Sequence, residues 1–249
     1  MTDKKILGIL GGLGPMSSVY FYEMLTSHTA ALRDQQHINI LISSRADIPD
    51  RTDFIMGRSS LDPLPAMRAE VQKLASIGAD IIAIPCNTAH YFYKGIAEDS
   101  PVPVLNIIEQ TASFCKHLGL GKVGVLATEG TVLSGAYRSA LMSRGIEYMT
   151  CDPADQAAVS EIIYGAIKQG KEPDIDAFLR VADSLSSSGC ERIILGCTEL
   201  SLLKRNCRLG ARFIDSLEVL AARAIAYCGC TPTGFDNDLM NFSQEKGSI

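Results

Sequence analysis

The chain has 249 residues, with 23 Lys and Arg against 28 Asp and Glu, so its formal net charge is −5. A hydrophobic fraction of 47% is enough to fill a core, which argues against a disordered chain. The mild acidity argues against nucleic acid or an anionic membrane surface as the main partner. No apolar run reaches the roughly 18 residues of a spanning helix, and the first apolar segment is too short for a secretion signal, so we expect a cytoplasmic protein.

The eight cysteines do not follow a pattern typical of disulfides or of zinc sites. A long chain without a secretion signal is a poor candidate for a disulfide scaffold. Cys228-Gly229-Cys230 is a C-x-C pair with no second pair at zinc-finger spacing. We therefore expect most cysteines to be small buried residues and expect no metal site.

Short apolar runs alternate with longer segments of helical spacing. The runs predict strands at residues 6–10, 38–42, 81–84, 102–105, 123–126, 193–195 and 213–214. The longer segments predict helices at residues 17–31, 63–77, 107–118, 134–144, 156–169, 174–188 and 217–227. Nearly continuous apolar strands are typical of parallel sheets covered on both faces, so the alternation predicts a doubly wound α/β fold. The polar stretch 231–249 is expected to be a flexible C-terminal tail.

An internal repeat predicts two similar lobes. The regions that begin at residues 4, 78 and 104 recur in the same order at residues 121, 189 and 213. In the second pair of regions, Cys86 and Cys197 each lie eight residues after a glycine and directly after a predicted strand. Ligands of open α/β sheets bind at the carboxyl ends of strands, so two facing lobes would place these cysteines on opposite walls of one cleft.

Two cysteines on either side of a substrate carbon could invert a stereocentre. We expect a helix that starts after each cysteine to lower the thiol pKa from about 8.5 toward neutrality, because a helix N-terminus favours the thiolate. A thiolate on one face would remove a proton and a thiol on the other would return one, without a covalent intermediate. Polar groups around Asn87, Thr88 and Thr198 could stabilise the carbanion.

The sequence around both cysteines resembles the two signature motifs of the aspartate/glutamate racemase superfamily. These segments are Pro85-Cys86-Asn87-Thr88-Ala89-His90 and Gly196-Cys197-Thr198-Glu199. Three further segments, at 11–15, 48–52 and 126–131, resemble its aspartate racemase branch. The similarity extends from about residue 5 to about residue 228.

The resemblance implies a cofactor-independent racemase that uses Cys86 and Cys197 as its bases and is typically a homodimer. It implies an active site between lobe 1, residues 1–102 plus 211–230, and lobe 2, residues 103–210. By analogy, Cys197 would deprotonate the L-enantiomer and Cys86 the D-enantiomer. Arg51 and Lys168 would hold the side-chain carboxylate of a dicarboxylic amino acid, as suits a cationic clamp. The other substrate-binding residues implied are Gly12, Met16, Ser17, Asn87, Thr88, Thr128, Thr131, Thr198 and Glu199.

Several of these residues also have simpler interpretations. A single unpaired cysteine is ordinarily a core residue, Arg51 could lie in a solvated turn, and Lys168 could complement a helix dipole. His90 lies one helical turn after Cys86, so a Cys–His nucleophilic pair is a further alternative. The glycine loop at 11–14 lacks the third glycine of a dinucleotide-binding motif.

Other functions also remain open at this point. One is a different activity of the same superfamily, namely a hydantoin racemase, a maleate isomerase or a decarboxylase. Another is a catalytically silent two-lobed binding protein for acidic amino acids. An uncharged hydantoin would not need two cations, and a pure binder would need neither thiol. In glutamate racemases His usually stands where this chain has Glu199, so the sequence favours aspartate as substrate, with possible breadth toward glutamate.

Overall fold

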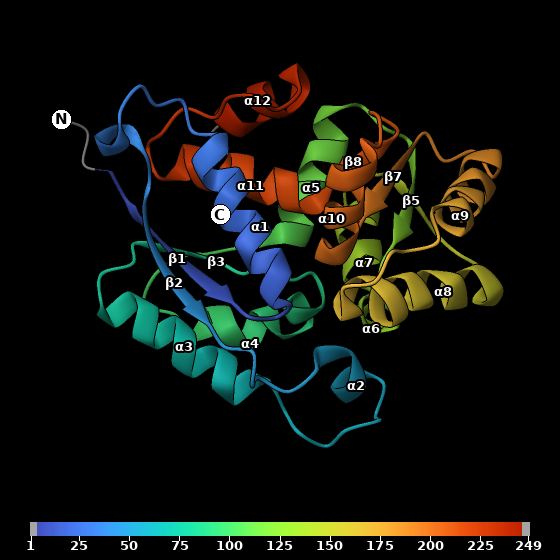
Figure 1. The fold of residues 1–249 in the computed structure, drawn as a ribbon, viewed down its shortest axis with the longest axis horizontal. Helices are drawn as coiled ribbons and strands as arrows, with labels where there is room; N and C mark the ends of the chain where they lie inside the picture. The colour runs from blue at the N-terminus through green and yellow to red at the C-terminus, as the bar shows by residue number, and fades with distance from the viewer. Residues whose placement is uncertain (1–3, 246–249) are drawn as a thin grey trace.

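The computed structural model describes residues 4–245 and contains two four-stranded parallel sheets (Figure 1). The first sheet has the order β2-β1-β3-β4 and the second has the order β6-β5-β7-β8. The strands of the first sheet are β1 (Ile6–Gly11), β2 (Asn39–Ser44), β3 (Ile81–Ala83) and β4 (Val104–Leu105). Those of the second are β5 (Lys122–Leu126), β6 (Glu147–Thr150), β7 (Arg192–Leu195) and β8 (Phe213–Asp215).

The two sheets have the same strand order, as the sequence repeat predicts. β1 and β5 take equivalent places, and so do β3 with β7 and β4 with β8. The prediction of an α/β fold with two parallel sheets is therefore confirmed. The sequence did not predict β6, because this edge strand is exposed or half-buried and has no apolar run.

Helices follow the strands in both halves. The first half contains α1 (Pro15–Ser27), α2 (Arg51–Ile55), α3 (Leu64–Ser76), α4 (Tyr93–Glu98) and α5 (Ile107–His117), with short 3-10 turns η1 (Asp34–Gln36) and η2 (Thr88–Phe92). The second half contains α6 (Glu129–Ser134), α7 (Ala136–Met142), α8 (Pro153–Ser160), α9 (Ile175–Ser187), α10 (Thr198–Cys207), α11 (Ser216–Tyr227) and α12 (Asn237–Gln244). The segment predicted as one helix at 156–169 contains three types of helix in succession. Helix α8 continues into a π-helical turn, η3 (Glu161–Ala166), which is followed by a 3-10 turn, η4 (Ile167–Gln169).

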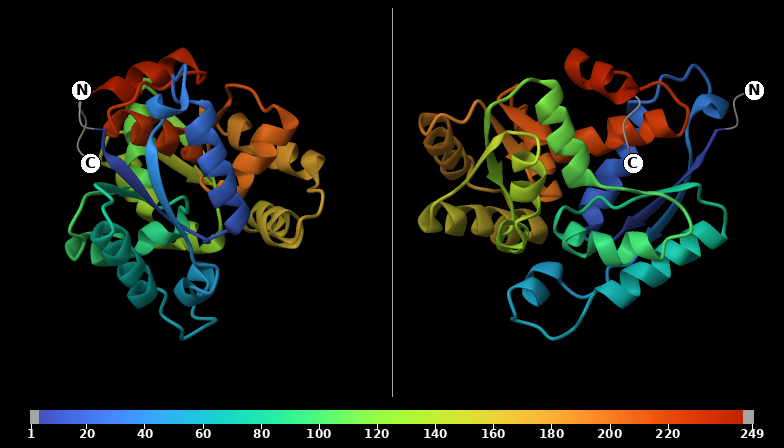
Figure 2. Two further views of the ribbon diagram at one scale, coloured as in Figure 1. Left: turned by 60° about the vertical axis from the view of Figure 1, so that its left-hand side comes forward. Right: turned by 180° about the vertical axis from the view of Figure 1, so that it is seen from behind.

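One apolar core joins the two lobes. Helices α5 and α11 lie between the sheets (Figures 1 and 2). The core contains Leu7 and Ile9 of β1 together with Val123 and Val125 of β5 and Leu217 of α11, all at most 1% exposed. Burial of each large aliphatic side chain stabilises the fold by about 1.5–3 kcal/mol. Because both lobes contribute to this core, it fixes the position of one lobe relative to the other.

The expected lobe boundaries need one correction. We expected residues 211–230 to return to lobe 1, with 103–210 forming lobe 2. Instead, β8 pairs with β7 in the second sheet, and β4 stays beside β3 in the first. The open edge of β7 needs hydrogen-bond partners, and the chain at β8 supplies them, for example at Ile193 N, which donates to the Arg212 carbonyl at 3.0 Å. Helix α11 of the returning segment packs against α1 of the first lobe.

The C-terminal residues are folded as far as Glu245, so the expectation of an unstructured tail is wrong for residues 231–245. Leu239 and Phe242 of α12 are 1% and 4% exposed, and the helix packs against α5 and α11 (Figure 2). The buried Arg223 guanidinium donates to the carbonyls of Phe242, Ser243 and Glu245. An apolar pair three residues apart is enough to give this short helix a buried face. Residues 246–249 of the predicted tail lie outside the described residues.

All eight cysteines are free thiols. Five are buried, as expected for most of them: Cys86, Cys115, Cys190, Cys197 and Cys228. Within residues 4–245, no helix combines the length and apolar character needed to cross a bilayer.

Candidate active site

The two repeat-related cysteines line the same cavity between the lobes. Cys86 follows β3 and Cys197 follows β7, and each is 5% exposed. The cavity has a volume of about 10 Å³, room for about one water molecule, so an amino acid can bind only when the walls move apart. The other lining residues are Leu13, Asp50, Arg51, Thr52, Asn87, Thr88, Thr128, Tyr164, Lys168, Thr198 and Glu199.

Most of the predicted site residues lie in this lining, and four do not. Thr131 lies directly behind the wall, with its Oγ1 2.9 Å from Thr88 Oγ1. The remaining three, Gly12, Met16 and Ser17, line a neighbouring pocket instead.

The sequence did not single out four lining residues: Leu13, Asp50, Thr52 and Tyr164. A signal existed for two of them. Asp50 directly precedes Arg51. Tyr164 lies one helical turn before Lys168, and this spacing places the side chains of Tyr164 and Lys168 on one helix face.

Hydrogen bonds from the second lobe fix the side chain of Asn87, next to Cys86. The hydroxyl of Tyr137 donates to Asn87 Oδ1 at 2.7 Å, and Asn87 Nδ2 donates to Ser216 Oγ at 3.0 Å. Ser216 Oγ in turn donates to the Leu195 carbonyl at 2.8 Å. Both ends of the Asn87 amide are therefore held by α7 and α11, and the residue cannot turn without breaking buried hydrogen bonds.

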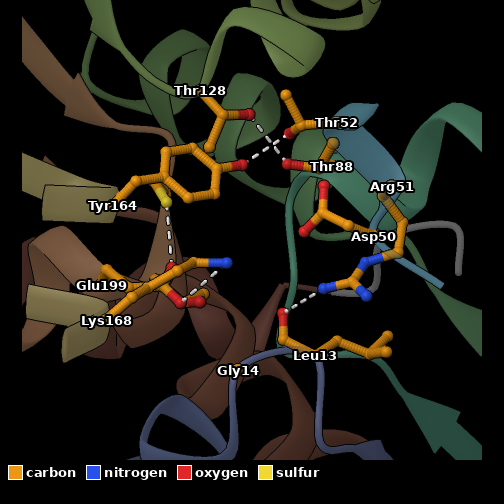
Figure 3. Close-up of polar contacts among 12 residues, drawn as sticks. Leu13, Gly14, Asp50, Arg51, Thr52, Thr88, Thr128, Tyr164, Lys168 and Glu199 are labelled. Atoms are coloured by element: carbon orange, nitrogen blue, oxygen red, sulfur yellow. Dashed lines mark hydrogen bonds and ion pairs between the residues drawn. The ribbon is translucent and has the colours of Figure 1, made fainter. Parts of the chain in front are cut away.

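Three threonine hydroxyls from both lobes form a second polar wall. Thr88 Oγ1 lies 3.0 Å from Thr128 Oγ1 (Figure 3) and 2.9 Å from Thr131 Oγ1. Thr128 also caps α6, because its Oγ1 accepts a hydrogen bond from Thr131 N. Hydroxyl hydrogens rotate, so this cluster can turn donors toward an anionic group in the cavity.

The Cys197 thiol lies against a charged pair. Its Sγ donates to Glu199 Oε2 at 3.0 Å, and Glu199 Oε1 lies 3.7 Å from Lys168 Nζ (Figure 3). Burial raises the pKa of the Cys197 thiol well above its usual value, and the Glu199 carboxylate raises this pKa further, whereas Lys168 lowers it. The expectation of a lowered pKa is therefore wrong for Cys197, because desolvation and the nearby negative charge outweigh the dipole of α10.

The π-helical turn η3 and the turn after it place Tyr164 and Lys168 in the cavity wall. Lys168 Nζ lies 4.7 Å from the centre of the Tyr164 ring, a cation–π contact. Burial lowers the pKa of Lys168, but the Glu199 carboxylate and the two cysteines raise it, and the net shift is upward. Lys168 therefore carries its charge into the cavity wall. The Tyr164 hydroxyl donates to Thr52 Oγ1 at 2.8 Å, which links the second lobe to α2 (Figure 3).

Arg51 is buried at 7% exposure, so the interpretation as a solvated turn residue is wrong. Its guanidinium donates to the carbonyls of Ile48, Pro49 and Leu13 at 3.2, 3.0 and 3.1 Å. Among residues 4–245, its buried Nε finds no hydrogen-bond partner. Arg51 therefore keeps one donor free for an acceptor.

His90 contacts backbone groups and not the Cys86 sulfur. Its Nδ1 lies 2.8 Å from the Cys86 carbonyl, and its Nε2 accepts a hydrogen bond from Ile107 N at 3.3 Å. Burial lowers the pKa of His90, which favours the neutral ring. These contacts give His90 a structural role and do not support a Cys–His nucleophilic pair. In the described part of the chain, no group of three or more His, Cys, Asp or Glu residues is placed to hold a metal ion.

Comparisons with known proteins identify the family of this chain. Residues 10–224 match the family described as Asp/Glu/hydantoin racemase. The chain is 30% identical over 226 residues to the broad specificity amino-acid racemase RacX of Bacillus subtilis (strain 168), an alignment that covers 89% of this chain and 97% of the relative.

Solved structures resemble this one over nearly their whole length. Picrophilus torridus aspartate racemase has a TM-score of 0.79 and 30% identity, with 96% of this chain and 99% of that one covered. An aspartate racemase homologue from Pyrococcus horikoshii OT3 has a TM-score of 0.73 and 25% identity, with 91% and 99% covered. The chain therefore belongs to the Asp/Glu/hydantoin racemase family and is an amino-acid racemase.

Proposed function

We propose that this racemase interconverts L- and D-aspartate by proton transfer between Cys86 and Cys197. The observation that carries the proposal is that two buried cysteines, one after each equivalent strand of the two lobes, line the same cavity. A single catalytic thiol would not need this duplication. A pure binding protein would not need either thiol.

In the proposed reaction the two cysteines exchange roles in each turnover. Cys197, as a thiolate, removes the α-proton of L-aspartate, and the Cys86 thiol protonates the carbanion on the opposite face. One thiolate and one thiol are present before and after the reaction, so the step needs no cofactor and no redox change. Glu199 already accepts the hydrogen bond of the Cys197 thiol and is placed to take its proton. Hydroxyls such as that of Thr88 would stabilise the negative charge on the substrate.

The charges of the cavity support a dicarboxylate as substrate. Arg51 has a buried Nε without a partner among the described residues, and Lys168 brings a positive charge to the same cavity. The resemblance to Picrophilus torridus aspartate racemase supports the same assignment.

A broader substrate range is the second candidate. The relation to RacX favours it, and so does the pairing of Lys168 with Glu199, which partly neutralises the cationic side of the cavity.

A screen of enantiomers tests the substrate. The purified chain, with no cofactor added, is incubated with L-aspartate, L-glutamate, L-asparagine and several neutral amino acids, and the D-enantiomers are measured by chiral chromatography. We expect aspartate to exceed its neutral isostere asparagine by at least about tenfold in kcat/KM, because the free Arg51 donor recognises the carboxylate. Equal rates for both would support the broad-specificity candidate.

Cysteine variants test the mechanism. Cys86→Ala and Cys197→Ala are each expected to abolish racemisation, whereas Cys115→Ala, at a buried cysteine outside the cavity, is the matched control. In heavy water, early deuterium should appear mainly in the product enantiomer. If both single variants keep full activity, or if substrate and product are labelled equally, the two-base scheme is wrong.

A further inference from the structure

A second pocket, separate from the cysteine cavity, lies where β8 and α11 meet α10 and the start of α12. Its volume is about 350 Å³, which is in the range of small-molecule sites, and the described residues that line it all differ from those around the cysteines. Phe114, Phe235 and Leu239 give it apolar walls. Among the described residues of its lining, four carboxylates face two cations: Asp215, Glu218, Asp236 and Asp238 against Arg192 and Lys204. This α11 pocket therefore combines apolar surface with an excess of negative charge.

One carboxylate oxygen in this lining has no partner. Asp215 is 2% exposed, and its Oδ1 accepts hydrogen bonds from Ser201 Oγ at 2.7 Å and from Leu217 N at 2.8 Å. Its Oδ2 is buried and has no hydrogen-bond partner among residues 4–245. Lys204, a cation of the same lining, donates to Glu218 Oε2 at 2.6 Å instead. Buried polar groups are nearly always hydrogen-bonded, so the free Oδ2 indicates that a donor from outside the chain binds here.

The internal repeat shows that the negative charge of Asp215 is not needed to cap the helix. Asp215 is the N-cap of α11, after β8, and Asn106 is the N-cap of α5, at the equivalent place after β4. Asn106 Oδ1 accepts hydrogen bonds from Ile108 N at 3.0 Å and from Glu109 N at 3.1 Å. A neutral amide therefore caps the helix in the first lobe, as is common at N-caps. The second lobe buries a carboxylate at the same place, and this extra charge calls for another purpose.

The electrostatics around Asp215 favour a positively charged ligand. Burial raises the pKa of Asp215 and that of Glu218, the Asp215 charge raises the pKa of Glu218 further, and Lys204 lowers both. A second positive charge beside the two carboxylates would favour their ionised forms, and its N–H groups would supply the donor that Oδ2 lacks. In the described part of the chain no group of three or more His, Cys, Asp or Glu residues is placed to hold a metal ion. The apolar walls suit an organic cation instead.

We propose that the α11 pocket binds a small organic cation, namely a primary amine with an apolar body. Its ammonium group would donate to Asp215 Oδ2 beside Glu218, and its apolar body would lie against Phe114, Phe235 and Leu239. Because Oδ2 is buried, a side-chain adjustment at the pocket wall would bring it into contact with the ammonium, as is common when ligands bind. The site is separate from the cysteines, so the proposal does not depend on which amino acid the enzyme racemises.

A matched pair of probes tests the class of ligand. 2-Phenylethylamine and 2-phenylethanol have the same size and the same apolar body, but at neutral pH only the amine carries a positive charge. Isothermal titration calorimetry with the purified full chain measures the Kd of each. We expect the amine to bind at least about tenfold more tightly than the alcohol, because a charge-assisted hydrogen bond to a carboxylate is stronger than the neutral one. If the amine does not bind, or binds no more tightly than the alcohol, the proposal is wrong.

Charge variants test the location of the site. Asp215→Asn keeps an Oδ1 that can cap α11, as Asn106 caps α5, but removes the negative charge, so we expect the Kd of 2-phenylethylamine to rise at least about tenfold. Asp174→Asn is the matched control, because Asp174 is the exposed N-cap of α9 and lies outside the pocket, and its Kd should stay unchanged.

A second pair of variants covers the case in which Asp215→Asn does not fold, which circular dichroism would show. Asp238 is exposed and lines the α11 pocket. We expect Asp238→Lys, compared with the neutral control Asp238→Asn, to raise the Kd of the amine at least about fivefold, because the new ammonium repels the bound one. An unchanged Kd in folded Asp215→Asn, or in Asp238→Lys where Asp215→Asn is unfolded, would place the amine elsewhere and overturn the proposal.

Discussion

Removing one hydroxyl group from Tyr137 tests how the two lobes hold Asn87 in place. Tyr137 is 1% exposed, and its hydroxyl donates to Asn87 Oδ1 at 2.7 Å. Tyr137→Phe keeps the ring but takes this donor from a buried acceptor, which costs about 1–3 kcal/mol. In a protein of this size each kcal/mol corresponds to about 2–4 °C in Tm, so we expect a decrease of about 2–12 °C. We also expect kcat/KM to fall, because the Asn87 amide loses one of the two bonds that orient it.

Thermal unfolding followed by circular dichroism, together with the racemisation assay, provides the readout. Tyr148→Phe is the matched control, because Tyr148 is a partly buried residue of the edge strand β6 whose ring lies under Arg138. Its hydroxyl donates no hydrogen bond within the described residues, so we expect a change within about 0.5 kcal/mol. If Tyr137→Phe and Tyr148→Phe give the same Tm and the same activity, the bond to Asn87 does not carry the role assigned to it.

Two further predictions concern the Cys197 thiol and the C-terminal helix. Glu199→Gln removes the negative charge that is, next to burial, the largest cause of the raised pKa of Cys197, so the Cys197 thiolate should form at a lower pH. The pH dependence of Cys197 alkylation in a Cys86→Ala background measures the midpoint of this titration. A midpoint that is unchanged or higher would contradict the prediction. Phe242→Ala should lower the free energy of unfolding by about 3–5 kcal/mol, since this side chain of α12 is 4% exposed. Urea denaturation measures that loss, and a loss below about 1 kcal/mol would mean that α12 contributes little to the fold.

The sequence was sufficient for features that depend on strand order and strand ends. Cys86 and Cys197 follow equivalent strands of a repeat, one strand in each sheet. Because ligands of open α/β sheets bind at the carboxyl ends of strands, the sequence predicted that two facing lobes would bring both cysteines to one cavity. The same reasoning predicted that Asn87 and Thr198 belong to the site, because each directly follows one of the cysteines. These positions depend on local order along the chain, which a sequence shows directly.

Other parts of the site depend on contacts that a sequence pattern does not contain. The Tyr164 hydroxyl donates to Thr52, a residue 112 positions away in the sequence. Tyr164 lies in a π-helical turn, and the spacing of apolar residues predicts only an ordinary helix there. The direction of the Cys197 pKa shift likewise depends on burial and on the rotamer of Glu199. The pairing of β8 with β7 depends on which sheet edge is open, and the short apolar run at β8 is compatible with either sheet.

The repeat supplies two equivalent thiols, but the residues after them make their surroundings different. Cys197 donates to the carboxylate of Glu199, whereas Cys86 is followed by Asn87, an amide held by Tyr137 and Ser216. This environment favours the protonated form of Cys197. In the proposed reaction, Glu199 would take or share that proton before Cys197 acts as a base. The two enantiomers have equal free energies, so kcat/KM must be the same in both directions whatever the asymmetry. The difference between the thiols can therefore appear only in how each direction divides kcat/KM between kcat and KM, and Glu199→Gln should change that division while the two ratios stay equal.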